Sequence, residues 1–189
     1  GNIEITVNPA VKKTFTLMLR IPGWVRNEAL PGNLYRFADS GNPASYSLTV
    51  NGKTISPEIV KGYAAISRNW KKGDKIILSL PMTPRTITAD PRVKADSLQI
   101  AIQRGPMIYC AEGAGNGDNL FDLQFHPQFM PLNARFDPML LGGTEVIETT
   151  ATDTDGSKPR PVILIPYFLW NNRGKSEMEV WLPIQTVRP

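Results

Sequence analysis

Cysteine and histidine are almost absent from this 189-residue chain, which contains one of each, Cys110 and His126. A single cysteine excludes an intrachain disulfide and any zinc site built from several cysteines. The sequence leaves a catalytic Cys-His dyad as an alternative, because residues far apart in the sequence can meet in space. However, His126 lies in a proline-containing loop, and no third orienting group accompanies it. We therefore predict no catalytic role for either residue.

Cys110 ends the strand-like stretch MIYC, in which period-2 alternation places Ile108 and Cys110 on one face and Met107 and Tyr109 on the other. A reactive thiolate needs a nearby cation, a metal or a helix N-terminus, and none is encoded locally. Free cysteine otherwise packs as a small apolar residue. We predict that Cys110 fills the core.

Long apolar runs and helical patterns are also missing. No stretch reaches the roughly 18 consecutive apolar residues that a transmembrane helix needs, so the sequence predicts no membrane partner. The 17 prolines are spread along the chain and leave no uninterrupted helical pattern. Residues 1–11 carry neither an initiator Met nor a basic-then-apolar leader, which favours a piece cut from a longer protein.

The excess of positive charge is small and dispersed. The formal net charge is +4, and the only adjacent lysine pairs are Lys12-Lys13 and Lys71-Lys72. Binding to a nucleic acid through its phosphates requires cations gathered on one face, usually together with a recognisable motif. Neither feature is present, so we expect no nucleic-acid partner.

The dominant pattern in the sequence is an alternation of apolar and polar residues. One face of TFTLMLRI carries four apolar residues, Phe15, Leu17, Leu19 and Ile21. Between two other strand-like runs, Asn51-Gly52 is the preferred pair for a two-residue hairpin turn. Many short strands with regular turn signals predict an all-β fold of antiparallel β-sandwiches. The stretches 27–44 and 112–143 break the rhythm and are predicted as long loops.

Paired carboxylates are the groups that hydrolysis of a glycosidic bond requires. Glu177 and Glu179 alternate on one face of SEMEVWLP, about 7 Å apart at the rise of a strand. The apolar residues between and after them supply the buried face, namely Met178, Val180 and Leu182. We therefore predict that the two glutamates form the solvated face of a half-buried strand. A self-contained hydrolase that uses either glutamate is the less favoured alternative.

Four tryptophans remain as candidates for binding, and they are Trp24, Trp70, Trp170 and Trp181. An indole face exposed on a loop or sheet can stack on a sugar ring while its edge forms hydrogen bonds. The alternative function is thus a carbohydrate-binding module with Trp24, Trp70 or Trp170 as platforms, which requires an exposed co-planar aromatic pair. Because Trp is highly buried on average, we favour large core residues instead.

Four stretches together resemble one family, and they are LRIPGW (19–24), GYAAISRNWKKGDKIILSLPM (62–82), ADPRVKADSLQIAIQRGPMIYCAE (89–112) and IPYFLWNNRGKSEMEVW (165–181). Their order and spacing are similar to those of the C-terminal part of the β-L-arabinofuranosidases, glycoside hydrolase family 127. The resemblance covers nearly the whole chain. It implies that a helical (α/α)6-barrel catalytic domain lies outside this chain, with its cysteine nucleophile, its zinc ligands and its acid–base glutamate.

The resemblance also implies a domain plan of two antiparallel β-sandwich domains in tandem. It places β-sandwich I over 1–91, β-sandwich II over 92–175, and a return strand over 176–189 that joins β-sandwich I. The implied function is a non-catalytic scaffold of a bacterial glycoside hydrolase that packs against its own catalytic barrel. No cofactor is then expected in this chain, because the zinc belongs to the barrel. Homodimerisation is left as an alternative. The parent protein is expected to be periplasmic or extracytoplasmic.

Overall fold

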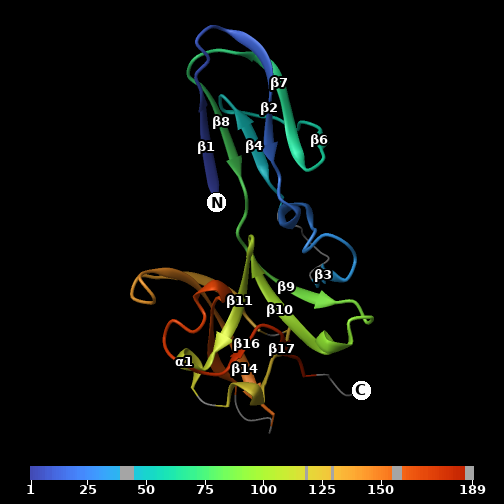
Figure 1. Cartoon of the computed structure of the whole chain (residues 1–189), viewed down its shortest axis with the longest axis vertical. Coiled ribbons are helices and arrows are strands. Elements are labelled where there is room, and N and C mark those ends of the chain that lie inside the picture. The colour runs from blue at the N-terminus through green and yellow to red at the C-terminus, as the bar shows by residue number, and fades with distance from the viewer. Residues whose placement is uncertain (39–44, 118, 129, 155–158, 186–189) are drawn as a thin grey trace. The chain divides into compact units, whose positions relative to one another are not determined.

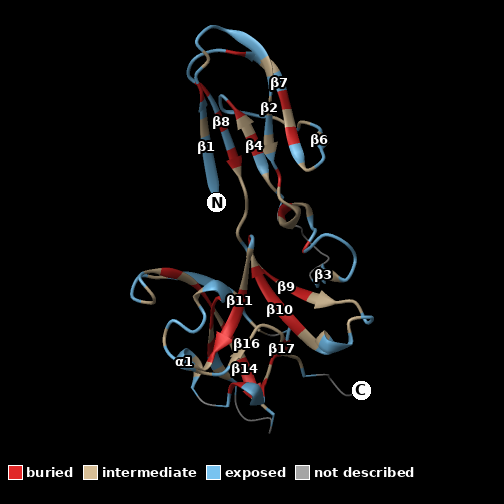
Figure 2. Cartoon of the chain, viewed as in Figure 1, coloured by how far each residue is buried: buried red, intermediate tan, exposed pale blue. Residues whose placement is uncertain are grey.

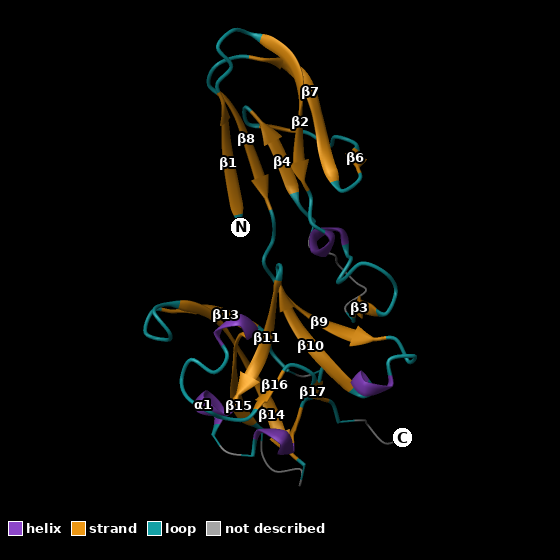
Figure 3. Ribbon diagram, viewed as in Figure 1, coloured by secondary structure: helices purple, strands orange, loops and turns teal. Residues whose placement is uncertain are grey.

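The computed structural model describes residues 1–38, 45–117, 119–128, 130–154 and 159–185. The chain forms two compact units, each with its own hydrophobic cluster. The first comprises Gly1–Pro31 and Gly41–Met82, and the second comprises Gly32–Ser40 and Thr83–Pro189. Strands account for most of the regular structure in both units, which confirms the all-β prediction (Figure 3). Within the described ranges, no helix is long and apolar enough to cross a membrane.

The first unit is a sandwich of two antiparallel sheets (Figure 1). One sheet has four strands, in the order β1 (Asn2–Val7), β8 (Asp74–Ser79), β4 (Ser47–Val50) and β5 (Lys53–Thr54). The other has three strands, in the order β2 (Lys13–Arg20), β7 (Tyr63–Trp70) and β6 (Ile59–Val60). A short 3-10 helix, η1 (Gly23–Arg26), follows β2.

The core of this unit lies between the two sheets. Alternate apolar residues of β2 pack against it, and they are Phe15, Leu17 and Leu19. Ile21, just beyond the strand, is fully buried. The turn between β4 and β5 is formed by Asn51 and Gly52 at φ angles of 50° and 76°, which are the positive values that a type I′ turn requires. The predicted strand face and the predicted hairpin turn are both confirmed.

The second unit contains one hydrogen-bonded sheet of ten strands. Seven of them follow in the order β12 (Leu123–Gln124), β14 (Thr144–Asp153), β15 (Arg160–Pro166), β11 (Met107–Glu112), β10 (Gln99–Arg104), β9 (Pro84–Ala89) and β3 (Tyr35–Phe37). Three more join them, and they are β13 (Asn133–Asp137) on β14, β16 (Met178–Glu179) on β11 and β17 (Leu182–Pro183) on β10. The short helices are η2 (Lys94–Asp96), α1 (Gly113–Asn116), η3 (Leu120–Asp122) and η4 (Tyr167–Leu169).

This ten-stranded sheet folds over around its own core. Phe125, directly after β12, forms a parallel bridge with Ile184, directly after β17, so that two strands far apart in the sheet order meet. The enclosed cluster includes the fully buried Ile102, Tyr109 and Leu164. Figure 2 shows buried residues along β10, β11 and β14 of this unit. The second predicted sandwich is therefore built from a single continuous sheet.

The boundary between the units lies at Met82 and Thr83 rather than after residue 91. The reason is β9, which pairs with residues Ala101–Arg104 of β10 and also carries β3 on its other edge. Alternation of apolar and polar residues can indicate a strand, but it does not say which strand is the hydrogen-bonding partner.

The predicted return of residues 176–189 to the first sandwich is wrong for the described part of that segment. β10 and β11 pair with each other only over Ile102–Arg104 and Met107–Tyr109. Beyond that point β16 pairs with the end of β11, and β17 pairs with the start of β10. The C-terminal segment enters where the β10–β11 hairpin separates, because the backbone groups of both strands need new partners there.

The two stretches predicted as long loops contain short regular elements. Residues 27–44 include β3, although 39–44 lie outside the described residues. Residues 112–143 include α1, η3, β12 and β13, with 118 and 129 outside the described residues. These elements are too short, at two to five residues, to produce a recognisable period in the sequence.

Candidate functional site

Cys110 is fully buried on the face of β11 opposite Tyr109, where it packs with Val146 and Ile165. Burial raises the pKa of its thiol to about 12, and the negative charge of Glu112 adds to this rise. The thiol is therefore protonated at neutral pH and is not a nucleophile. The prediction that Cys110 fills the core is confirmed.

His126 shares a hydrogen bond with Oγ1 of Thr152, 3.0 Å from its Nε2 atom, and makes no dyad with the thiol. No group of three or more His, Cys, Asp or Glu side chains comes together to hold a metal ion among the residues that the structure describes. The described residues therefore do not provide the ligand set of the zinc site that the resemblance implies for the barrel.

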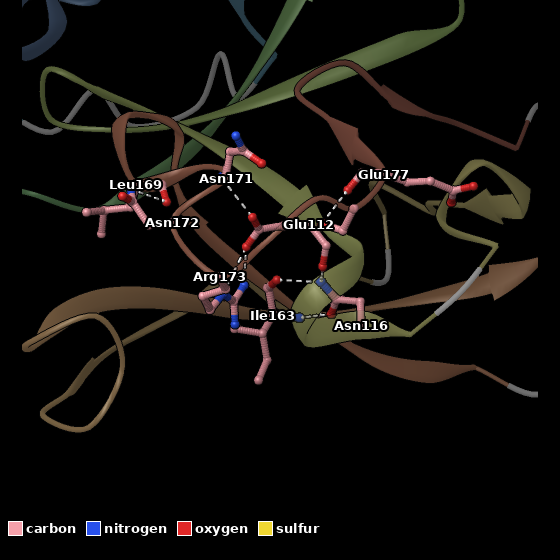
Figure 4. Close-up of polar contacts among 9 residues, drawn as sticks. Glu112, Asn116, Ile163, Leu169, Asn171, Asn172, Arg173 and Glu177 are labelled. Carbon is pink, nitrogen blue, oxygen red and sulfur yellow. Dashed lines mark hydrogen bonds and ion pairs between the residues drawn. The ribbon is translucent and has the colours of Figure 1, made fainter.

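A buried carboxylate at the end of β11 is the main polar feature that the sequence did not reveal (Figure 4). The side chain of Glu112 is 0% exposed. Its Oε1 accepts a hydrogen bond from the backbone N–H of Asn171 at 2.9 Å, and its Oε2 accepts from Nε and Nη2 of Arg173 at 2.9 and 2.5 Å. Three donors thus surround a charge that water does not reach, which is the condition for keeping an ionised carboxylate buried.

A second set of bonds fixes the backbone around Glu112. The amide of Asn116 donates to the carbonyls of Glu112 and Ile163, both at 2.9 Å, and accepts from the N–H of Ile163 at 2.7 Å. The N–H of Gly113 donates to the carbonyl of Glu177 at 2.9 Å. Helix α1 is therefore fastened to β15 on one side and to the C-terminal segment on the other.

The carboxylate holds a segment that we call the η4 loop, residues 167–176, between β15 and β16. Leu169 points inward and packs against the cluster around Cys110. Three aromatic residues of the loop point outward, namely Tyr167, Phe168 and Trp170, at 47%, 67% and 39% exposure. The rings of Tyr167 and Trp170 are nearly parallel, with centroids 6.3 Å apart and an interplanar angle of 11°.

The η4 loop continues into a polar surface pocket of about 530 Å³. The loop and the residue after it supply Arg173, Lys175, Ser176 and Glu177, while α1 supplies the opposite wall. Arg173 thus lines the pocket and bonds to Glu112 at the same time. The pocket has charges of both signs and contains no nucleophile paired with a base.

The predicted tryptophan platforms differ in their surroundings. Trp70 is 0% exposed and donates from Nε1 to the carbonyl of Phe15 at 3.0 Å, so it cannot present a face to a ligand. Trp24 is half-buried against the core of the first unit. Trp181 stacks on Tyr35 with centroids 5.6 Å apart. Of the three proposed platforms, Trp170 alone belongs to an exposed parallel pair among the described rings.

The prediction of a solvated glutamate face holds for Glu177 and fails for Glu179. Glu177 is exposed and its Oε2 accepts from the N–H of Leu120 at 2.7 Å. Glu179 is half-buried, and its Oε2 is buried without a hydrogen-bond partner in the described structure. Burial raises the pKa of Glu179 to about 7, and the charge of Glu177 adds to the rise. The pocket is lined by Glu177 but not by Glu179, so the two carboxylates do not converge on one cleft.

Comparisons with known proteins divide the chain where the structure does. The family model of the β-L-arabinofuranosidase middle domain of glycoside hydrolase family 127 matches residues 1–82. The model of the glycoside hydrolase family 127 C-terminal domain matches residues 84–183. The two matches meet at the boundary between the two compact units, Met82 and Thr83.

Similar proteins are much longer than this chain. The non-reducing end β-L-arabinofuranosidase of Bifidobacterium longum subsp. longum is 30% identical over 96% of this chain but only 28% of its own length. A solved family 127 β-arabinofuranosidase is 40% identical with a TM-score of 0.88, covering 98% of this chain and 30% of that one. A β-L-arabinofuranosidase from Geobacillus stearothermophilus T6 is 35% identical with a TM-score of 0.81, covering 98% and 29%. This chain, which spans less than a third of those relatives, belongs to glycoside hydrolase family 127 and comprises its middle and C-terminal domains.

Proposed function

We propose that this chain is a non-catalytic scaffold region of a β-L-arabinofuranosidase-like glycoside hydrolase and packs against a separate catalytic barrel domain. One observation carries the proposal. The chain aligns over 96% to 98% of its own length with enzymes of which it covers only 28% to 30%. Most of each enzyme is thus a part that this chain does not contain.

The chemistry of the described residues supports the same proposal. The cysteine is a buried, protonated thiol, and the half-buried Glu179 does not share a cleft with Glu177. The described residues offer no metal cluster. Nucleophile, acid–base group and zinc are therefore assigned to the barrel domain of the parent protein.

The hairpin of β13 and β14 is the surface that we assign to this packing (Figure 3). Among the described strands, β13 pairs only with β14, and four of its five residues are exposed. Phe136 is 59% exposed and Met139, in the turn, is 90% exposed. Large apolar side chains displayed together on a projecting hairpin are typical of a surface that a partner covers.

The test is to express the catalytic domain of the parent protein separately and titrate it with this chain in a calorimeter. We expect saturable association, weakened about tenfold or more by a Phe136→Ser, Met139→Ser double variant, because contacts of large apolar residues dominate such interfaces. A Tyr63→Ser variant is the control, since Tyr63 is an exposed aromatic residue of the first unit. Hydrolysis of an aryl β-L-arabinofuranoside by this chain alone would refute the proposal.

A further inference from the structure

We propose that the η4 loop binds a short neutral saccharide, with Tyr167 and Trp170 as its stacking surface. The two rings are nearly parallel, at an interplanar angle of 11°, and both remain open to solvent at 47% and 39% exposure. Sugar rings present flat patches of C–H groups that pack on aromatic faces, while the phenol O–H and indole N–H stay free to hydrogen-bond. This site does not depend on packing against a catalytic domain.

The same loop lines a polar pocket with Arg173, Lys175 and Ser176, and we assign this pocket to the polar half of the site. Its volume of about 530 Å³ falls within the range of small-ligand sites. Ser176 and Lys175 can donate hydrogen bonds to hydroxyl groups, and Glu177 can accept them.

The charges of the pocket favour a neutral ligand. Arg173 is already engaged, because both Nε and Nη2 donate to the buried carboxylate of Glu112. The remaining cation and anion of the lining are Lys175 and Glu177, whose formal charges cancel. An anionic or cationic ligand would therefore gain little Coulomb energy, whereas hydroxyl groups can use both residues.

The aromatic pair is held in place before any ligand arrives. Leu169, which lies between the two aromatic residues in the sequence, anchors the loop in the apolar cluster around Cys110, and Glu112 fixes the backbone of Asn171 directly after Trp170. A loop that is already ordered loses less conformational entropy on binding, which raises its affinity for a small ligand. The buried carboxylate thus positions the stacking surface without touching the ligand.

The experiment is a titration of the 189-residue chain with arabino-oligosaccharides, and in parallel with cello-oligosaccharides, followed by calorimetry and by tryptophan fluorescence. We expect saturable binding with a change in fluorescence. Trp170→Ala and Tyr167→Ala should each weaken binding about tenfold or more, whereas Trp170→Phe, which keeps an aromatic face, should retain part of the affinity. Lys175→Met should weaken binding several-fold with no change in the environment of the rings.

The matched control is Phe136→Ala, which removes an exposed aromatic residue of the same unit outside the loop. It should leave saccharide binding unchanged, and thermal unfolding should confirm that each variant is folded. Two results would overturn the proposal. One is the absence of saturable binding to either saccharide. The other is binding that survives Trp170→Ala unchanged. Quenching by acrylamide would then show whether Trp170 is covered in the full-length parent protein, which would make the loop an interdomain contact instead.

Discussion

Glu112 shows what a single buried charge contributes to this molecule. Its side chain is 0% exposed and that of its partner Arg173 is 21% exposed. Removing a carboxylate from water costs several kcal/mol, and only well-placed donors offset that cost. The η4 loop supplies those donors through Asn171 and Arg173, so the loop cannot detach without leaving a charge buried and unpaired.

Replacing Glu112 by Gln tests this coupling at the residue scale. The amide keeps the shape but removes the charge that Arg173 requires, and we expect the free energy of unfolding to fall by roughly 3–5 kcal/mol. Urea denaturation of both proteins measures the difference. The control is Glu4→Gln, which breaks the exposed pair with Lys75 and should leave the free energy of unfolding nearly unchanged. Equal losses in the two variants would contradict the assignment.

Glu179 predicts a dependence of stability on pH. Its pKa is raised from 4.5 to about 7 in the folded protein, so within that range the native state holds a proton that the unfolded chain has released. The contribution of Glu179 to the free energy of unfolding should therefore be highest at pH 4.5 and below, fall as the pH rises, and level off above about 7. The contribution is on the order of 3 kcal/mol.

The measurement is urea denaturation of the wild type and of Glu179→Gln between pH 4.5 and 8. At each pH, the free energy of unfolding of Glu179→Gln is subtracted from that of the wild type, which removes the effect of the other carboxylates. This difference should decrease as the pH rises across that window, because only the wild type loses the contribution of Glu179. A difference that does not vary with pH would show that the carboxylate is solvated in the folded protein.

At the scale of elements, β16 and β17 are only two residues long each, so their few backbone hydrogen bonds cannot hold the C-terminal segment alone. Side-chain burial supplies the rest. Leu182 is fully buried in the main cluster of the second unit, while Met178 and Val180 pack on the opposite face against the cluster around Cys110. The segment contributes to both faces of the sheet.

Leu182→Ala should therefore destabilise the second unit by about 2–5 kcal/mol, the usual range for truncating a buried leucine. Leu98→Ala is the control, because Leu98 is 61% exposed and its truncation should cost about 0.5 kcal/mol or less. Chemical denaturation reports both values. A loss of similar size in the control would indicate that the position of the leucine does not matter.

Sequence periodicity predicts strands well here and their partners poorly. The alternation in β2 and the Asn51-Gly52 turn have local causes, and both appear in the structure as expected. The partner of β9 and the place of β16 and β17 depend on contacts between distant residues. Glu112 is the clearest case, since its partner Arg173 lies 61 residues further along the chain. No local pattern distinguishes a carboxylate that will meet such a partner from one that will face water.

At the scale of the whole molecule, the described residues of each compact unit form hydrophobic clusters of their own, and none of these clusters is shared between the units. Units with their own cores can unfold independently. We expect differential scanning calorimetry to resolve two transitions, or one transition whose van't Hoff enthalpy is clearly smaller than the calorimetric enthalpy. Leu182→Ala should lower the temperature of one transition by several degrees and leave the other in place. A single two-state transition that shifts as a whole would contradict independent cores.

The pairing of β3 with β9 affects how the chain can fold during its synthesis. Tyr35 pairs with Ala89, and strands β4 to β8 of the first sandwich are encoded between them. At roughly 5–20 residues per second on the ribosome, β3 emerges about 3–10 seconds before its partner. The first sandwich can close only once β8 (Asp74–Ser79), the partner of β1 and β4, has been made, and β3 stays without its partner until then and beyond. The nascent chain must therefore keep this strand from joining the wrong sheet until β9 has been made.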